Sequence, residues 1–312
     1  MEEKISIIPK RKESIKRFIP VYVMALPGLL YILINNYMPM SGLIIAFKNF
    51  SAKKGIWGSD WAGFNNFKFL FQTEDAWVIT RNTLLYNTAF IFFGTILAVT
   101  IAILLSEIGS KRAGRLYQSV ILLPYLVSWV IISYLVFAFF SAESGFVNET
   151  ILSMMGKDPT SWYNEAGYWP FIIVAVYLWQ STGYTSIVYY ASVVGIDRTY
   201  YEAAEMEGAG PLKKIRYITL PLLRPVMITM VMLSVGKIFY SDFGLFYQIP
   251  MSSGALLQTT NVIDTYVYRG LLQQGNIGMS AAAGLYQSVV GFLVVLAANQ
   301  AVRKIDKESA FF

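Results

Sequence analysis

Six long apolar stretches constrain the fold of this chain more than any other feature of its sequence. Each is long enough to cross a lipid bilayer, which takes about 20 residues of helix. We therefore expect an all-α integral membrane protein with six transmembrane helices, the first of them bent at Pro27 and Pro39. The stretches cover residues 19–47, 84–105, 117–140, 170–192, 223–241 and 280–302.

The composition supports a membrane protein and excludes several kinds of chemistry. Of the 312 residues, 55% are hydrophobic and 14% are charged, whereas about 25% are charged in an average soluble domain. The chain contains no cysteine and no histidine. This excludes disulfides, thiolate and imidazole metal sites, cysteine or serine–histidine catalysis and a histidine proton relay. We expect no metal site and no catalytic residue.

The distribution of basic residues predicts the orientation of the spans. With the N-terminus inside, the cytoplasmic segments 1–18, 106–116, 193–224 and 303–312 hold 17 of the 25 Lys and Arg residues. Such an excess is typical of cytoplasmic loops, so both termini are expected in the cytoplasm. This placement explains the net charge of +6, and no nucleic-acid partner is expected. The N-terminal tail is expected to contact anionic membrane lipid.

The chain is expected to form one membrane domain without a soluble domain. Residues 1–18 are a basic cytoplasmic tail, and residues 19–83 hold the first span and an aromatic outer interfacial segment. Residues 84–302 form a core of five further spans with a polar loop at 193–222. Residues 303–312 are a second cytoplasmic tail. The polar loop carries the most information about function.

A short helix is expected to begin the polar loop. Thr199 and Glu202 have the spacing of a capping box, in which both side chains pair with backbone N–H groups at a helix start. Asp197 is an alternative N-cap for the same helix. Ala203 and Ala204 would let the backbone of this helix approach a partner's groove closely. A capped loop without any partner explains the local pattern equally well.

A glycine turn is expected to separate this helix from a second one. Gly208 or Gly210 should end the first helix, because glycine readily adopts the left-handed conformation of a helix C-terminus. Pro211 fits the first turn of a following helix. That second helix is expected to end near Pro221.

The loop resembles the EAA loop of the permeases of bacterial binding-protein-dependent ABC importers. The matching order is Glu202-Ala203-Ala204, three residues, Gly208, nine residues and Ile218-x-Leu220-Pro221. Glu207 stands where many members of the family have Asp. In that family this helix lies in a cleft of the cytoplasmic ATPase and couples its closure to the membrane helices. The resemblance thus implies an ATPase-coupling site of Glu202, Ala203, Ala204, Glu207, Gly208, Ile218, Leu220 and Pro221.

The resemblance extends over nearly the whole chain. The segment "WAGFNNFKFLF" is similar to the family's segment after the first span. The segments "YYEAAEMEGAGPLKKIRYITLPLLRP" and "VIDTYVYRGLLQQGNIGMSAAAGLYQSVVG" are similar to its oligosaccharide branch, which includes maltose-permease-like subunits and permeases for polysaccharide fragments. This implies a type I importer fold in the bacterial cell membrane and transport by alternating access.

The resemblance also implies an assembly. The expected partners are a second, homologous permease, two sugar-type ABC ATPases and an extracellular, lipid-anchored sugar-binding protein that docks on the outer loops 141–169 and 243–279. The chain has no phosphate-loop motif of the form G-x-x-x-x-G-K-[ST]. ATP and Mg²⁺ should therefore bind to the ATPase subunits, and this chain should bind no cofactor.

Two alternative functions are an ion-coupled sugar transporter and a membrane enzyme. An ion-coupled sugar transporter usually keeps carboxylates within its spans, but the six stretches contain no Asp or Glu. Such a transporter would have to bind its ion through backbone carbonyls and hydroxyls. A membrane enzyme would need paired carboxylates or a nucleophile with a base, and no such cluster occurs in the sequence.

Polar and aromatic residues within the spans are candidates for a sugar pathway. Their alternative role is hydrogen bonding between spans, and the "SAAAG" run with Gly284 is expected to serve close helix packing. Lys237 lies about 20 Å beyond Arg224 along a helix, so it faces either a water-filled cavity or, by extending outward, the outer interface. The candidates are Trp179, Gln180, Tyr184, Lys237, Tyr240 and Gln287.

Overall fold

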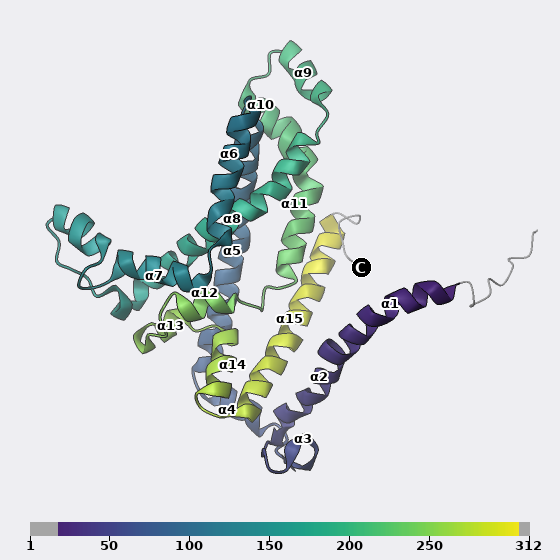
Figure 1. Ribbon diagram of the computed structural model, residues 1–312, viewed down its shortest axis with the longest axis vertical. Helices are drawn as coiled ribbons and strands as arrows, with labels where there is room; N and C mark the ends of the chain where they lie inside the picture. Colours follow the sequence, from purple (N-terminus) through teal and green to yellow (C-terminus); the bar gives the residue numbers. More distant parts are fainter. Residues whose placement is uncertain (1–17, 306–312) are drawn as a thin grey trace, which may run out of the picture.

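Helices form almost all of the protein in the computed structural model, which describes residues 18–305. Five helices are long and apolar enough to cross a membrane, and a sixth crossing is possible if one bent pair counts as a span. Helices α5 and α15 each have one end near α4, while α9 lies at the opposite end of the molecule (Figure 1). Residues 1–17 and 306–312, which include most of both expected tails, lie outside the described residues.

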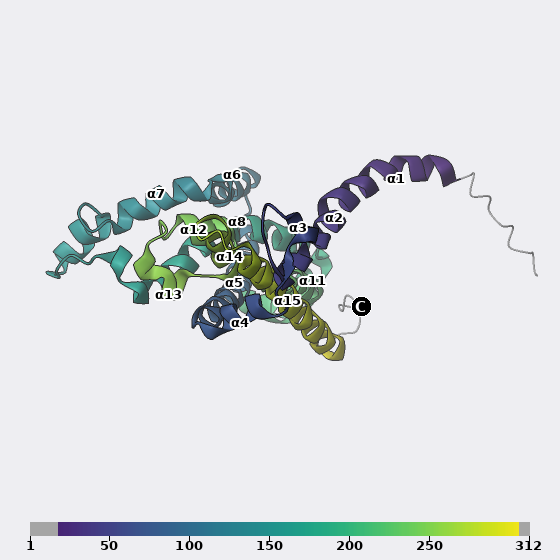
Figure 2. The ribbon, with the colours of Figure 1, turned by 90° about the horizontal axis from the view of Figure 1, so that it is seen from below.

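The first span departs from the rest of the molecule. It comprises α1 (Ile19–Ile32), a π-helical turn at Leu33–Tyr37, α2 (Met38–Met40) and a 3₁₀ segment at Ser41–Phe47. The irregular turns lie next to Pro39, which cannot donate a helical hydrogen bond. As Figure 2 shows, α1 extends away from the other helices, and none of its residues is buried.

A compact outer segment follows the first span. Strands β1 (Lys48–Asn49) and β2 (Asp60–Trp61) pair in antiparallel fashion around α3 (Gly55–Gly58). Helix α4 (Asn65–Gln72) then leads into the next span. Phe47 stacks on Trp61 and also packs against Phe67. This aromatic cluster fits the interfacial segment expected from the sequence.

Helices α5 (Asp75–Ser106), α8 (Trp169–Val194) and α11 (Leu220–Val235) form the centre of the bundle. Their buried faces meet in an apolar cluster that includes Ala98, Tyr189 and Leu223. Helix α15 (Ile277–Ile305) completes the set and packs against α4, α5 and α14 through a second cluster. The expected spans 84–105, 170–192 and 280–302 all lie within these helices.

The expected span 117–140 is divided by a sharp bend that its apolar pattern does not indicate. It consists of α6 (Lys111–Leu122), a 3₁₀ turn at Leu123–Leu126 and α7 (Trp129–Phe140), and the two helical halves meet at 93°. Pro124 removes a backbone donor at the bend, and the Ser128 hydroxyl restarts the chain by capping α7. In Figure 1, α7 projects sideways from the bundle.

Short helices pack against the bundle away from α9 (Figure 1). They are α12 (Phe243–Gln248), α13 (Leu257–Thr260) and α14 (Ile263–Leu272), together with a π-helical turn at Val147–Leu152 and 3₁₀ turns at Trp162–Asn164, Ala166–Tyr168 and Gly254–Leu256. Phe246, Ile249 and Leu256 pack with α5 and α8 in a third buried cluster. The outer loops are therefore part of the core.

Close helix packing occurs at a different glycine from the expected one. A Cβ at Gly284 would meet nothing within 4 Å, whereas a Cβ at Gly183 would lie 2.0 Å from the carbonyl oxygen of Ile121. Gly183 therefore allows α8 to contact α6 closely. Within the "SAAAG" run, Ala282 and Ala283 are fully buried, so that part of the prediction is confirmed.

Candidate functional site

The polar loop begins with helix α9 (Arg198–Met206). Its N-cap is Asp197, whose carboxylate accepts a 2.9 Å hydrogen bond from the backbone N–H of Thr199. This bond lowers the pKa of Asp197. The capping box of Thr199 and Glu202 is therefore wrong, and Glu202 instead lies exposed in the middle of the helix. The helix begins two residues earlier than a Thr199 cap requires, which favours the alternative considered from the sequence.

The end of α9 confirms the prediction for Gly208. Its φ of +74° is a left-handed conformation that glycine adopts without a steric cost. The N–H of Gly208 donates to Glu205, and the N–H of Ala209 donates to Ala204, each at 2.9 Å. These two bonds define a Schellman motif, which pairs carbonyls that the end of the helix would leave open.

The second helix of the loop does not end near Pro221. Helix α10 (Pro211–Lys214) starts at Pro211 as expected, but it continues through a π-helical turn at Ile215–Thr219 directly into α11. The N–H of Leu220 donates to Ile215, five residues back. This wider turn lets Pro221, which has no N–H, enter the next helix without breaking it. The part of the loop that follows Gly210 and the fifth span thus form one helical unit, Pro211–Val235.

Two side-chain contacts join α9 to this unit. The ammonium of Lys214 lies 2.6 Å from the Glu205 carboxylate. The hydroxyls of Tyr201 and Thr219 lie 2.9 Å apart, and Thr219 is buried. These groups line a polar cavity of about 380 Å³ between α9 and the neighbouring ends of α5 and α8. These contacts therefore join α9 directly to the helical unit that contains α11.

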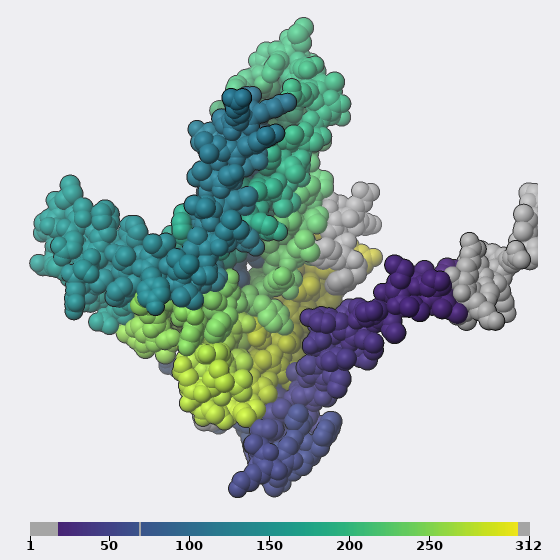
Figure 3. Space-filling model, viewed as in Figure 1, coloured from purple at the N-terminus to yellow at the C-terminus, as the bar shows by residue number. Residues whose placement is uncertain are grey.

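The opposite side of the loop is exposed. Glu202, Ala203, Glu207 and Gly208 all face solvent. Large apolar side chains accompany them, since Met206 is 90% exposed and Leu212 is 82% exposed. Ile218 is half-buried, and Leu220 and Pro221 are exposed at the start of α11. In Figure 3 the loop forms the projecting tip of the molecule, opposite the outer segment. A protruding tip with exposed apolar residues is typical of an interaction surface.

The pathway candidates on α8 differ in their exposure. Trp179 and Tyr184 are exposed, and the ring of Tyr184 stacks on that of Tyr125 at 4.5 Å. Gln180 is buried and donates to the carbonyl of Tyr125 at 3.4 Å. Tyr125 lies at the bend between α6 and α7. It was missed from the sequence because the bend that brings it to α8 depends on tertiary packing.

The fifth span ends before two further candidates. Helix α11 stops at Val235, and Lys237 lies in an irregular turn that starts at Gly236, not on the continuous helix expected for 223–241. After Gly236 the turn is formed by i→i−3 hydrogen bonds, from Lys237 to Ser234 and from Ile238 to Val235. Both Lys237 and Tyr240 are exposed, and the Tyr240 hydroxyl lies 3.4 Å from that of Ser288.

The last candidate, Gln287, is buried at the same break. Its amide donates to the carbonyl of Phe239 at 2.6 Å and to both carboxylate oxygens of Asp264 at 3.2 Å. Asp264 also accepts a 2.8 Å bond from the backbone of Ser241. Asp264 was not singled out from the sequence, since it lies outside the apolar stretches. An acidic residue among apolar neighbours in "VIDTY" was the available signal.

Comparisons with known proteins place these features in context. Residues 90–307 match the family described as "Binding-protein-dependent transport system inner membrane component". Protein LplB of Bacillus subtilis (strain 168) is 35% identical over 298 residues, 96% of this chain and 93% of that protein. The polygalacturonan/rhamnogalacturonan transport system permease protein YteP of the same organism is 32% identical over 308 residues, 97% of this chain and 94% of that protein.

Solved structures are similar over nearly the whole chain. A bacterial ABC transporter involved in the import of the acidic polysaccharide alginate matches with a TM-score of 0.84 and 32% identity, over 94% of this chain and 98% of that chain. The same score and identity hold for a bacterial alginate ABC transporter in complex with an alginate pentasaccharide-bound periplasmic protein, over 94% and 97% of the two chains. None of these comparisons supports ion-coupled transport.

Proposed function

Because this chain belongs to the family of binding-protein-dependent transport system inner membrane components, we propose that it imports an acidic oligosaccharide or polysaccharide fragment as a permease subunit of an ABC importer. The family is one of transport permeases. The single observation behind the substrate is the match, at 32% identity and a TM-score of 0.84, to a transporter involved in the import of alginate. YteP, whose name refers to polygalacturonan, agrees with an acidic sugar.

The polar loop, which contains α9, is the proposed contact with a separate ATPase. It combines an exposed helix, small alanine side chains and the protruding Met206 and Leu212. A helix of this kind can insert into a groove of a partner. The contacts Lys214–Glu205 and Tyr201–Thr219 would pass its movement to α11. ATP and Mg²⁺ would bind to that ATPase, and this chain would neither bind nor hydrolyse ATP.

A second permease is proposed to bury the apolar surface of α1. None of the residues of this apolar helix is buried, and Met24 on it is 82% exposed. Small-residue or apolar contacts with a homologous subunit would bury it in the assembled transporter.

The outer segments 141–169 and 243–279 are the proposed docking surface for an extracellular sugar-binding protein. A periplasmic binding protein accompanies the alginate transporter in the second solved structure.

The transport pathway is proposed to pass the exposed aromatic and cationic side chains near α8 and the end of α11. Trp179 and Tyr184 offer aromatic faces, and Tyr240 offers a hydroxyl. Exposed Lys237 would attract a uronate carboxylate. Gln180 and Gln287, which are both buried, would shape this surface through their hydrogen bonds to Tyr125, Phe239 and Asp264.

Reconstituted transport tests the proposal. The chain, its partner permease, the ATPase and the binding protein are placed in liposomes, and uptake of a labelled uronate oligosaccharide is compared with that of a neutral one of equal length. Uptake of the uronate sugar is expected, and its loss is expected when the phosphate-loop Lys of the ATPase is replaced. Undiminished uptake with that ATPase variant would contradict an ATP-driven importer. Preference for the neutral sugar would contradict the acidic substrate.

A further inference from the structure

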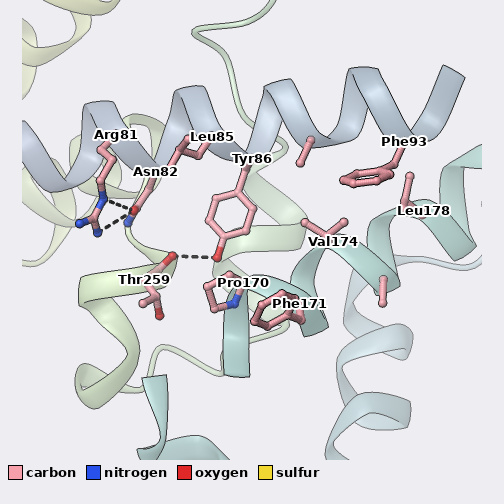
Figure 4. A pocket seen from close by; sticks show the side chains of 12 residues that line it. Arg81, Asn82, Leu85, Tyr86, Phe93, Pro170, Phe171, Val174, Leu178 and Thr259 are labelled. Atoms are coloured by element: carbon pink, nitrogen blue, oxygen red, sulfur yellow. Dashed lines mark hydrogen bonds between the residues drawn. The ribbon is translucent and has the colours of Figure 1, made fainter. Parts of the chain in front are cut away.

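A deep apolar groove lies between α5 and α8, away from the coupling loop. Its volume is about 680 Å³. Leu85, Ala89 and Phe93 line it from α5, and Phe171, Val174 and Leu178 line it from α8. Figure 4 shows that polar groups gather at one end of the groove and that Phe93 and Leu178 lie at the other end.

The polar end contains a cation without an acidic partner. Arg81 donates to the side-chain oxygen of Asn82 and to the carbonyl of Gln258, both of which are neutral. Among residues 18–305, no ion pair includes Arg81. The neighbouring hydroxyl of Tyr86 is occupied by the carbonyl of Thr259 at 2.8 Å. The guanidinium therefore lies at the mouth of an apolar groove without a carboxylate partner among residues 18–305.

The position of Arg81 along α5 corresponds to the edge of the bilayer. The helix has 32 residues, so its length of about 48 Å exceeds the roughly 30 Å hydrocarbon core by about 9 Å at each end. Arg81 lies six residues after the start of α5 at Asp75, a distance of about 9 Å. Its charge thus lies at the level of lipid headgroups.

The length of the groove corresponds to one leaflet. Arg81 and Phe93 are twelve residues apart on α5, which is about 18 Å at 1.5 Å per residue. Half of the hydrocarbon core is about 15 Å thick. An acyl chain whose phosphate lies beside Arg81 would therefore run along the groove to Phe93 and end near the middle of the bilayer.

From the geometry we infer that this groove is a binding site for an anionic phospholipid. The apolar walls hold one acyl chain, and the planar guanidinium pairs with the headgroup phosphate, an anion that arginine binds well. The uncompensated charge of Arg81 selects a lipid with net negative charge over a zwitterionic one. This site is independent of the transported substrate and of the ATPase.

Photocrosslinking tests the site in the assembled transporter. Phosphatidylglycerol or phosphatidylcholine with a photoreactive group in the acyl chain is added to nanodiscs, and labelled peptides are mapped by mass spectrometry. We expect labelling within residues 81–93 and 170–178, with about fivefold preference for phosphatidylglycerol, the selectivity of one basic side chain near an anionic surface.

Variants separate the role of the charge from that of folding. Arg81→Gln should abolish the preference, Arg81→Lys should keep most of it, and Ala89→Trp should fill the groove and remove the labelling. Lys68→Gln is the matched control, because Lys68 is an exposed cation outside the groove. Equal labelling by both lipids, or an unchanged preference in Arg81→Gln, would overturn the inference.

A protein occupant gives a different result. The chain has no cysteine, so Ala175→Cys introduces a single thiol into the groove. If a helix of the partner permease filled the groove, this thiol would be protected from a membrane-soluble maleimide and no lipid would label residues 81–93. That pair of results would overturn the lipid site.

Discussion

At the residue scale, a buried polar network stabilises the irregular backbone that follows α11. Asp264 and Gln287 come from different helices, and together they pair with the backbone of Phe239 and Ser241. Burial raises the pKa of the Asp264 carboxyl, although its hydrogen bonds with Ser241 and Gln287 oppose this effect. A carboxyl whose pKa is raised in the folded state favours folding at low pH, and this contribution is lost as the pH rises through the folded pKa.

Replacing Gln287 with glutamate tests this network. Gln287→Glu removes the amide donor and places a second carboxyl beside Asp264, which raises the pKa of Asp264 further. We expect a loss of about 1–3 kcal/mol in stability at pH 7, with recovery as the pH falls because a proton is then shared by the two carboxyls. Thermal unfolding in detergent between pH 5 and 8 measures the effect. Gln287→Leu serves as control, since it also removes the amide donor but adds no second carboxyl, so the recovery at low pH should be smaller.

A second prediction at this scale concerns Lys237. Because its ammonium is exposed beside the proposed pathway, Lys237→Met should lower uptake of uronate oligosaccharides about twofold to fivefold, as expected for one exposed ion pair. Uptake of a neutral sugar should change little, if that sugar is carried at all. Proteoliposome uptake of both sugars provides the measurement. Equal uptake of the uronate sugar by the variant and the unmodified protein would contradict a role for Lys237.

At the scale of elements, the coupling loop owes its shape to backbone geometry more than to packing. Helix α9 has no buried residue, and its ends are fixed by the Asp197 cap and the Schellman motif at Gly208. The helix that follows runs without interruption from Pro211 to Val235. The second half of the loop is therefore continuous with the fifth span.

Gly208→Pro should disrupt the end of α9. Proline cannot adopt the φ of +74° found at Gly208 and has no N–H to donate to Glu205. Membrane insertion should be preserved, while sugar-stimulated ATPase activity of the assembled transporter should be lost. Gly210→Ala is the matched control, because Gly210 has an ordinary φ of −72° and open space around it. Normal stimulation in Gly208→Pro would show that the end of α9 is not needed for coupling.

Charge reversal tests the contact between α9 and α10. Glu205→Lys or Lys214→Glu alone should reduce sugar-stimulated ATPase activity up to about fivefold, the range of one exposed ion pair, because like charges would then push the helices apart. The double variant should restore activity. Failure of the double variant to recover, with both single variants impaired, would mean that these residues act separately and not as a pair.

At the scale of the whole molecule, two separate apolar surfaces are exposed. Helix α1 is apolar but contacts little of the bundle (Figure 2), and the α9 tip exposes further apolar residues. Exposed apolar surface of this extent marks sites that a membrane or a partner covers. The two surfaces lie in different parts of the molecule, so they would serve different partners.

A photoreactive amino acid at Met24 tests the proposed cover of α1. When the two permeases are produced together, the crosslinker should give a covalent product of the two subunits. A crosslinker at Met154, which is exposed in the outer segment 141–169, is the control and should not give this product. Crosslinks from Met24 to lipid alone would contradict burial of α1 against a second permease.

The sequence by itself determined the membrane class, the approximate spans and the helix–glycine turn–helix form of the polar loop, because hydrophobic length and helix-end chemistry are local properties of the chain. The positions of Gly208 and Pro211 could be predicted from a few neighbouring residues. The membership of the family likewise followed from the fixed spacing between Glu202 and Pro221. These features depend on no distant contact.

Only the tertiary structure decided where the helices bend, end and meet. The 93° bend before α7 and the stop of α11 at Val235 interrupt apolar stretches whose pattern continues through them. The burial of Gln287 against Asp264 joins residues that are far apart in the sequence. Pro221 did not end its helix, since a wider turn accommodated it. Packing can override a local preference because burial of apolar surface and pairing of buried polar groups involve larger free energies than propensity does.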